Sequence, residues 1–210
     1  MDNYSNEETI SRIIKLTEGL VEFWGNSYGW ATIDSTNILT KSRLDWQASL
    51  SRQLKLFLNE ETIKESGALI LAWTTLGSLT EGIMKLFLSI WYENYKEELN
   101  KKDISSIRRK NGIRDLIEPD ELVLDNLRVF FQFRVYPKKV REIWKKEGQI
   151  DWIDWILKIQ NRRNAIHAFK HREIGTFDEF YIELRNYLDF MRLISSTFPY
   201  PDEIYIPLEY

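Results

Sequence analysis

Residues 66–99 read SGALILAWTTLGSLTEGIMKLFLSIWYENYKEEL, and this stretch decides the fold of the chain. Apolar side chains recur at steps of three and four residues from Leu69 through Trp73 to Ile90, which is the spacing of an α-helix. The first half of the stretch is apolar nearly all round, and such a helix has to be covered by neighbours. We therefore predict that residues 66–99 form the central helix of a bundle.

Helical patterns flank this stretch on both sides. We expect further helices from the capping box at Ser5 to Trp24, over residues 34–59, 122–133 and 150–167, and from the capping box at Thr176 to about Thr197, with a short amphipathic piece at 140–146. Strand-like alternation is confined to residues 203–208, and no repeat of fixed period occurs. The prediction is an all-α fold, an up-and-down helical bundle with additional N-terminal and connecting helices, forming a single domain over 1–210 with its core at about 34–196.

Length and composition limit the classes of protein that fit. A chain of 210 residues with 43% hydrophobic side chains suits one globular domain. The absence of cysteine excludes disulfides and thiolate metal sites. The N-terminus lacks the pattern of a signal peptide, and the most apolar segment, 66–80, is shorter than the ~20 residues of a membrane helix. We expect a cytoplasmic protein with no membrane partner.

Positive charge is concentrated in two blocks, although the net charge is −3. The first block is Lys101, Lys102, Arg108, Arg109, Lys110 and Arg114, in a basic loop predicted over 100–118; the second is Arg134, Lys138, Lys139, Arg141, Lys145 and Lys146. Local basic patches of this kind attract phosphates even on an acidic protein. Solvated helix ends and a loop explain either block equally well.

Residues 160–172, QNRRNAIHAFKHR, hold both histidines of the chain. Arg163 and His167 are four residues apart, so on a continuous helix they share a face. A metal site is not expected, because two histidines without cysteine, next to arginines, make a poor ligand set. Phosphate-binding glycine loops are also absent, and we predict no cofactor.

An arginine beside a histidine is suited to RNA cleavage. A guanidinium binds phosphate oxygens in bidentate fashion, and an imidazole exchanges protons near neutral pH with a ribose 2′-hydroxyl or a leaving oxygen. The alternative is that Arg162 and Arg163 are solvated and that His167 is a helix-end residue favoured by the helix dipole. Spacing alone favours the second interpretation, because an arginine and a histidine at this distance arise easily in a chain with many basic residues.

The order of the parts resembles the HEPN superfamily of all-α proteins: an apolar central helix, a penultimate helix ending in R-x-x-x-x-H at residues 162–167, and a capped last helix. The resemblance implies a metal-independent endoribonuclease of toxin–antitoxin or antiphage defence systems, active as a homodimer with the two motifs facing each other. It implies that His167 is the general acid or base and that Arg162 binds the scissile phosphate, with Arg163 and Asn164 in supporting positions. The partners would be an RNA substrate and an antitoxin or sensor protein.

One residue departs from a family subclass. HEPN toxins that are silenced by nucleotide transfer commonly carry H-x-Y, and the tyrosine receives the nucleotide. Phe169 stands at that position here, and it has no hydroxyl to modify.

Glu81 is the second candidate site residue, because an unpaired carboxylate on the central helix would be unfavourable. It either reaches the motif and orients Arg162 or Arg163, or pairs with Lys85 one turn away. His171 is expected on the surface. Trp152 and Trp155 are expected in the core, with a base-stacking or dimer surface as the alternative.

Two rival functions stay open. The chain could be a non-catalytic HEPN-like module that binds a nucleotide or a partner protein, or a plain helical scaffold. An open cleft onto which Arg162 and His167 converge would favour the nuclease, and a His167 buried among apolar residues would argue against it.

Overall fold

The structure is a computed structural model that describes residues 4–26, 31–59, 65–101, 109–110, 113–114, 117–135, 150–167 and 169–209. These residues are helical or irregular apart from a ladder of two residues a strand, Arg109–Lys110 (β1) paired antiparallel with Ile113–Arg114 (β2). The prediction of an all-α fold is confirmed. The strand-like alternation at 203–208 does not correspond to a strand: the segment begins with a 3₁₀ turn and contains no β-strand.

Eight α-helices are described. They are α1 (Asn6–Gly25), α2 (Ile33–Lys41), α3 (Leu44–Gln53), α4 (Ser66–Ile90), α5 (Tyr92–Lys101), α6 (Leu124–Phe130), α8 (Trp152–Arg163) and α9 (Phe177–Ser195). Short 3₁₀ turns are η1 (Leu54–Leu58), η3 (Pro119–Glu121), η5 (Asn164–His167) and η6 (Glu203–Tyr205), and η4 (Phe131–Val135) is a π-helical turn that continues α6.

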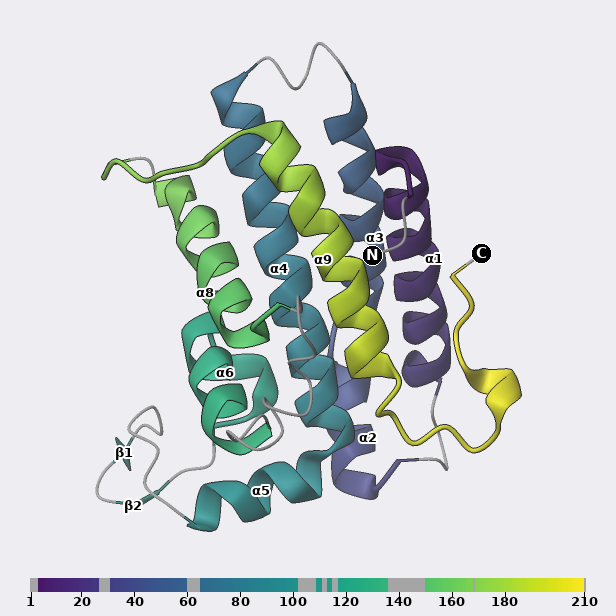
Figure 1. Cartoon of the computed structure of the whole chain (residues 1–210). Coiled ribbons are helices and arrows are strands. Elements are labelled where there is room, and N and C mark those ends of the chain that lie inside the picture. The colour runs from purple at the N-terminus through teal and green to yellow at the C-terminus, as the bar shows by residue number, and fades with distance from the viewer. Residues whose placement is uncertain are drawn as a thin grey trace.

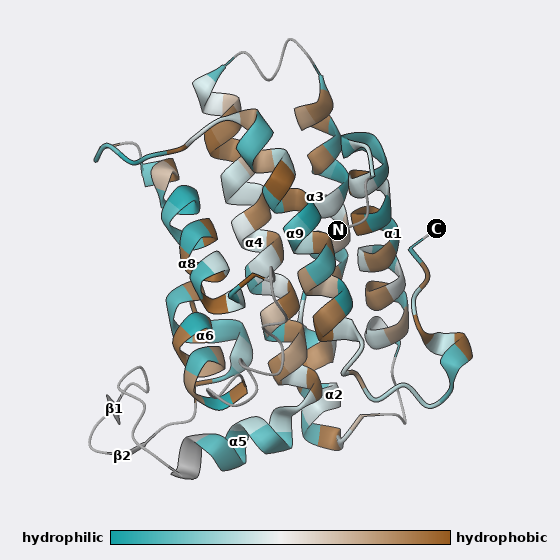
Figure 2. Ribbon diagram, viewed as in Figure 1, coloured by the Kyte–Doolittle hydropathy of each residue, from teal (hydrophilic) through white to brown (hydrophobic). Residues whose placement is uncertain are grey.

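Helix α4 lies at the centre of the bundle, with α3, α8 and α9 packed along it (Figure 1). Trp73, Leu76 and Met84 on α4 have no exposed surface, as expected for a helix surrounded by neighbours. The hydrophobic sides of the surrounding helices face inward toward α4 (Figure 2). The prediction of a central helix is confirmed in position.

Two predicted helices are broken in the structure. The helix predicted over 34–59 is interrupted at Ser42, whose extended backbone (φ −71°, ψ 145°) ends α2 before α3 begins. The central helix predicted to reach residue 99 stops at Ile90, and α5 begins again after Trp91. Apolar spacing continues across both breaks, so periodicity alone did not reveal them.

The remaining boundaries are close to those predicted. Both capping residues act as expected: Ser5 Oγ accepts from the Glu8 amide at 3.1 Å, and Thr176 Oγ1 accepts from the Glu179 amide at 3.2 Å. Pro119 begins the separate turn η3 rather than the helix predicted over 122–133, which starts at Leu124. The amphipathic piece at 140–146 and most of the loop at 100–118 lie outside the described residues.

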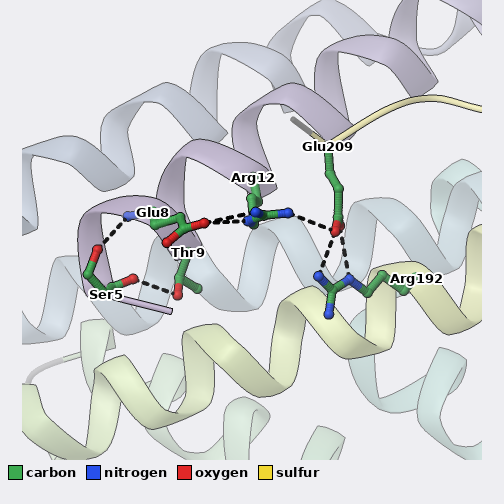
Figure 3. Close-up of polar contacts among 6 residues, drawn as sticks. All are labelled: Ser5, Glu8, Thr9, Arg12, Arg192 and Glu209. Atoms are coloured by element: carbon green, nitrogen blue, oxygen red, sulfur yellow. Dashed lines mark hydrogen bonds and ion pairs between the residues drawn. The ribbon is translucent and has the colours of Figure 1, made fainter. Parts of the chain in front are cut away.

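The C-terminal segment is held against α1 and α9 by Glu209 (Figure 3). Its carboxylate accepts from Arg192 Nε at 2.9 Å and Nη2 at 2.6 Å, and from Arg12 Nη1 at 3.2 Å. Arg12 in turn binds Glu8 one turn earlier in α1. The hydrogen bonds from Arg192 lower the pKa of Glu209 below its usual value.

Candidate functional site

The R-x-x-x-x-H motif spans the end of α8 and the turn η5. Asp151 caps α8, accepting from the amides of Ile153 and Asp154, and the apolar face of the helix is buried against α4 and α6. The α-helix ends at Arg163, and residues 164–167 continue as a 3₁₀ turn. Because each 3₁₀ residue advances by about 120°, Arg163 and His167 do not share a face as they would on a continuous helix.

Arg162 is almost covered, with 11% of its side chain exposed. Its Nη2 donates to Glu179 Oε2 at 3.0 Å, its Nη1 lies 3.4 Å from Glu173 Oε1, and its guanidinium carbon is 5.6 Å from the centre of the Trp73 ring. Gly175 has a positive φ of 68°, and a side chain there would collide with Arg162 and Glu179. Arg162 on α8 therefore contacts both α9 and α4, next to the segment that connects α8 to α9.

Arg163 lies against α4 instead. Its aliphatic stem packs on Gly77, where an added Cβ would be only 2.6 Å from Arg163 Cδ. Its Nη1 donates to Glu81 Oε2 at 2.9 Å, and the other oxygen of Glu81 binds Lys85 Nζ at 2.9 Å. Glu81 thus makes both contacts that the sequence offered as alternatives, one to the motif and one to Lys85.

His167 is exposed and ends η5. Among the described residues its imidazole has no hydrogen-bond or ion-pair partner. Buried Ala165 anchors the turn, and Asn164 caps α8 by donating its backbone N–H to the carbonyls of Gln160 and Arg162. The turn therefore holds His167 at the surface, and His167 is not buried among apolar residues.

Two exposed apolar side chains lie close to His167 in the sequence. Ile166 is 42% exposed and Phe169 is fully exposed, next to His171, which is also exposed as predicted. Single exposed apolar side chains are common on protein surfaces and do not by themselves identify a contact surface.

Trp155 is a core residue as predicted, and Trp152 is half-buried and packs against the core. The two rings meet edge to face at 5.6 Å and pack on Phe190, and Trp155 is buried with its Nε1 donating to Glu183 at 2.7 Å. The alternative of a base-stacking surface is wrong for Trp155, because its ring faces are covered.

Four residues around the motif were not identified from the sequence: Gly77, Glu173, Gly175 and Glu179. The capping box indicated that Glu179 lies in the first turn of the last helix, but nothing in the sequence connected it with Arg162. The small size of Gly77 was a usable signal, because glycine inside a helix is unfavourable unless another group approaches closely.

The described residues contain no group of three histidine or acidic side chains arranged to hold a metal ion. None of the helices in the described ranges combines the length and the apolar character needed to cross a bilayer. No protein-family model, curated protein or solved structure matches this chain. The resemblance to HEPN proteins thus depends on the motif at 162–167 and on the order of the helices around it.

Proposed function

We propose that this chain is a metal-independent endoribonuclease of the HEPN type that acts as a toxin or antiphage defence effector. The observation that carries the proposal is the exposed imidazole of His167, held on a short turn that directly follows two arginines at the end of a packed helix. An imidazole in such a position can exchange protons with an RNA substrate from solvent.

The balance of charge favours Arg163 over Arg162 as the group that binds phosphate. Arg162 is paired with two carboxylates, those of Glu173 and Glu179. Arg163 and Lys85 share the single carboxylate of Glu81, which leaves one net positive charge. A phosphate would therefore be attracted to Arg163 and Lys85, and Arg162 would position the end of α8.

The proposed reaction needs only protein side chains. An imidazole removes the proton from a ribose 2′-hydroxyl, and the oxygen attacks the adjacent phosphorus. The bond from phosphorus to the 5′-oxygen breaks, and that oxygen takes a proton from an imidazolium. The products are a 2′,3′-cyclic phosphate and a 5′-hydroxyl.

A homodimer is part of the proposal. Ile166 and Phe169, which precede and follow His167 in the sequence, expose apolar surface. Pairing two copies through this surface would bring two histidines together and place the arginines of each copy near the other motif. An antitoxin or sensor protein that covers the same surface would block the site.

The test is RNA cleavage by purified protein in EDTA. His167→Ala should abolish cleavage while the fold is retained, and His171→Ala, which changes the neighbouring exposed histidine, should keep it. A substrate with 2′-deoxyribose at the cleaved position should resist the wild-type protein. Undiminished cleavage by His167→Ala would rule out the proposal, and growth of cells expressing each variant gives a second readout.

The internal pairing of Arg162 supports a second candidate, a non-catalytic HEPN-like module that binds a nucleotide or a partner protein. An arginine that holds two carboxylates of its own chain serves the fold without any substrate. This candidate predicts that the pure protein cleaves no RNA and that Phe169→Ser weakens capture of a partner while His167→Ala does not.

A further inference from the structure

A groove of about 670 Å³ lies between α1 and the C-terminal segment, residues 199–209. Figure 1 shows this segment on the side of the bundle opposite α8, so the groove is separate from the proposed nuclease site. The floor of the groove is one helical stripe of α1: Lys15, Glu18, Gly19, Glu22 and Asn26. At 1.5 Å per residue this stripe is about 16 Å long. Residues 204–208 of the C-terminal segment form the wall.

Three contacts fix the C-terminal segment along α1. The ring centres of Tyr205 and Phe23 are 5.5 Å apart. Pro207 packs directly on Gly19, where an added Cβ would be only 2.6 Å from Pro207 Cβ. Glu209 is held by the two arginines described above (Figure 3). Every second residue is thus anchored, and the segment runs antiparallel to α1. A wall fixed in advance lowers the entropic cost of binding a partner.

The residues between these anchors expose aliphatic surface. Ile204, Ile206 and Leu208 are 79%, 47% and 62% exposed, and all three line the groove. One exposed aliphatic side chain is ordinary, but three along one wall of a groove form a continuous apolar surface, which is typical of binding sites. The anchored segment therefore presents aliphatic side chains that the fold of the chain does not use.

The charge around the groove is mainly negative. Glu22 is exposed, and its carboxylate has no partner among the described residues. It lies near the C-terminal end of α1, whose last turn has no basic residue to balance the helix dipole. Asp202 and Glu203 are exposed beside the wall, and no lysine or arginine follows Arg192 in the sequence. Only Lys15, at the other end of the stripe, is positive. Two copies meeting through this surface would bring like charges together, so a basic partner is favoured.

We propose that this groove binds a basic amphipathic helix of a partner protein. Its aliphatic stripe lies against residues 204–208, and a lysine or arginine lies against Glu22. A helix of about 11 residues matches the 16 Å of the groove, and laying an apolar face into a groove is a common mode of recognition. A strand is disfavoured, because Pro207 has no N–H to donate to a ladder. The site does not depend on the nuclease proposal, because it shares no residue with the motif.

Two stapled helical peptides of about 11 residues test the groove by fluorescence anisotropy. Both carry leucine along one face, and the remaining positions are lysine in one peptide and glutamate in the other. At low ionic strength the lysine peptide should bind wild-type protein at least about tenfold more tightly than the glutamate peptide, because its charge is opposite to that of the groove. Equal affinity of the two peptides, or no binding of the lysine peptide, would overturn the proposal.

Exchanges of aliphatic residues locate the binding. The double variant Ile206→Ser/Leu208→Ser should weaken the lysine peptide at least about tenfold, because two side chains leave the apolar contact. The control is Ile33→Ser/Leu56→Ser, which removes two exposed aliphatic side chains elsewhere and should leave the affinity unchanged. All four positions are exposed, so both proteins should fold. Binding that survives Ile206→Ser/Leu208→Ser contradicts the assignment.

Exchanges of charge test the second half of the proposal. Glu22→Gln should weaken the lysine peptide about threefold, whereas Glu7→Gln, the same change in the first turn of α1, should have no effect. Equal effects of the two changes would show that only the total charge matters, which contradicts the proposal. Sedimentation of the protein without peptide examines the other occupant: a dimer that is lost in Ile206→Ser/Leu208→Ser would assign the groove to a second copy and overturn the basic partner.

Discussion

Replacement of Arg162 by alanine should destabilise the protein, whereas the same replacement of His167 should not. Arg162 has 11% of its side chain exposed and connects α8 to Glu179 of α9 across Trp73 of α4. His167 is exposed and has no side-chain hydrogen bond within the described part of the chain. If both residues were only catalytic, neither change would affect stability.

The magnitude follows from what Arg162→Ala removes. Burial of the aliphatic stem contributes about 1.5–2 kcal/mol at ~0.8 kcal/mol per methylene. The ion pair with Glu179, which is itself 45% exposed, adds about 0.5–1 kcal/mol, and the pair with the exposed Glu173 adds almost nothing. The expected loss is about 2–3 kcal/mol, or a fall in Tm of roughly 5–10 °C for a chain of this length.

The assay is urea denaturation followed by circular dichroism, with thermal melts in parallel. Arg162→Lys is the matched variant: it keeps the charge and part of the stem but loses the planar fork, so we expect about half of the loss. His167→Ala should stay within about 0.5 kcal/mol of wild type, as surface changes usually do.

The reasoning is refuted if Arg162→Ala loses less than about 1 kcal/mol, or if His167→Ala is as unstable as Arg162→Ala. The result also decides how activity data are interpreted. Loss of RNA cleavage in Arg162→Ala would reflect a disturbed helix end, so His167→Ala is the informative variant for catalysis.

Three further predictions concern the packing around the bundle. Glu183 is 4% exposed and accepts a hydrogen bond from Trp155 Nε1. Glu183→Leu should lower the free energy of unfolding, measured by urea titration, by about 3 kcal/mol, because the buried donor loses its acceptor. Gly175→Ala should cost about 1–2 kcal/mol in the same assay, since φ is 68° and alanine resists that conformation; an unchanged midpoint would contradict this. Glu209→Gln should destabilise by about 1 kcal/mol at pH 7. Arg192 lowers the pKa of Glu209 from 4.5, so the stability difference between wild type and Glu209→Gln is complete above pH 4.5 and disappears as the pH falls through the lowered pKa. Thermal melts of both proteins at pH 7 and below pH 4 measure this difference. A stability difference that grows in acid would contradict the prediction.

The candidate site was only partly predictable from the sequence. The spacing of Arg163 and His167 indicated one shared face, but the change from α-helix to 3₁₀ turn after Arg163 moves them apart. Periodicity cannot reveal that change, because a few residues of either helix have similar sequence preferences. The contact between Glu81 and Arg163 was foreseen as one of two alternatives, since a carboxylate on an apolar helix needs a partner.

The roles of the two arginines required the tertiary structure. In the sequence Arg162 and Arg163 are neighbours of the same type. In the fold, the 100° step between them directs Arg162 to the turn before α9 and Arg163 to α4. The shortest ion pair of Arg162 is with Glu179, 17 residues away, and that of Arg163 is with Glu81, 82 residues away. Local sequence carries no information about contacts over such separations.

The sequence by itself determined the helical class, the central position of residues 66–90 and the two helix caps at Ser5 and Thr176, because these depend on local spacing and local hydrogen bonds. Tertiary structure alone decided where the helices break, which arginine is paired with which carboxylate, and that the aliphatic residues of the C-terminal segment line a groove instead of packing into the core. These features arise from side chains that meet only after distant segments pack together, and packing is a property of the whole chain.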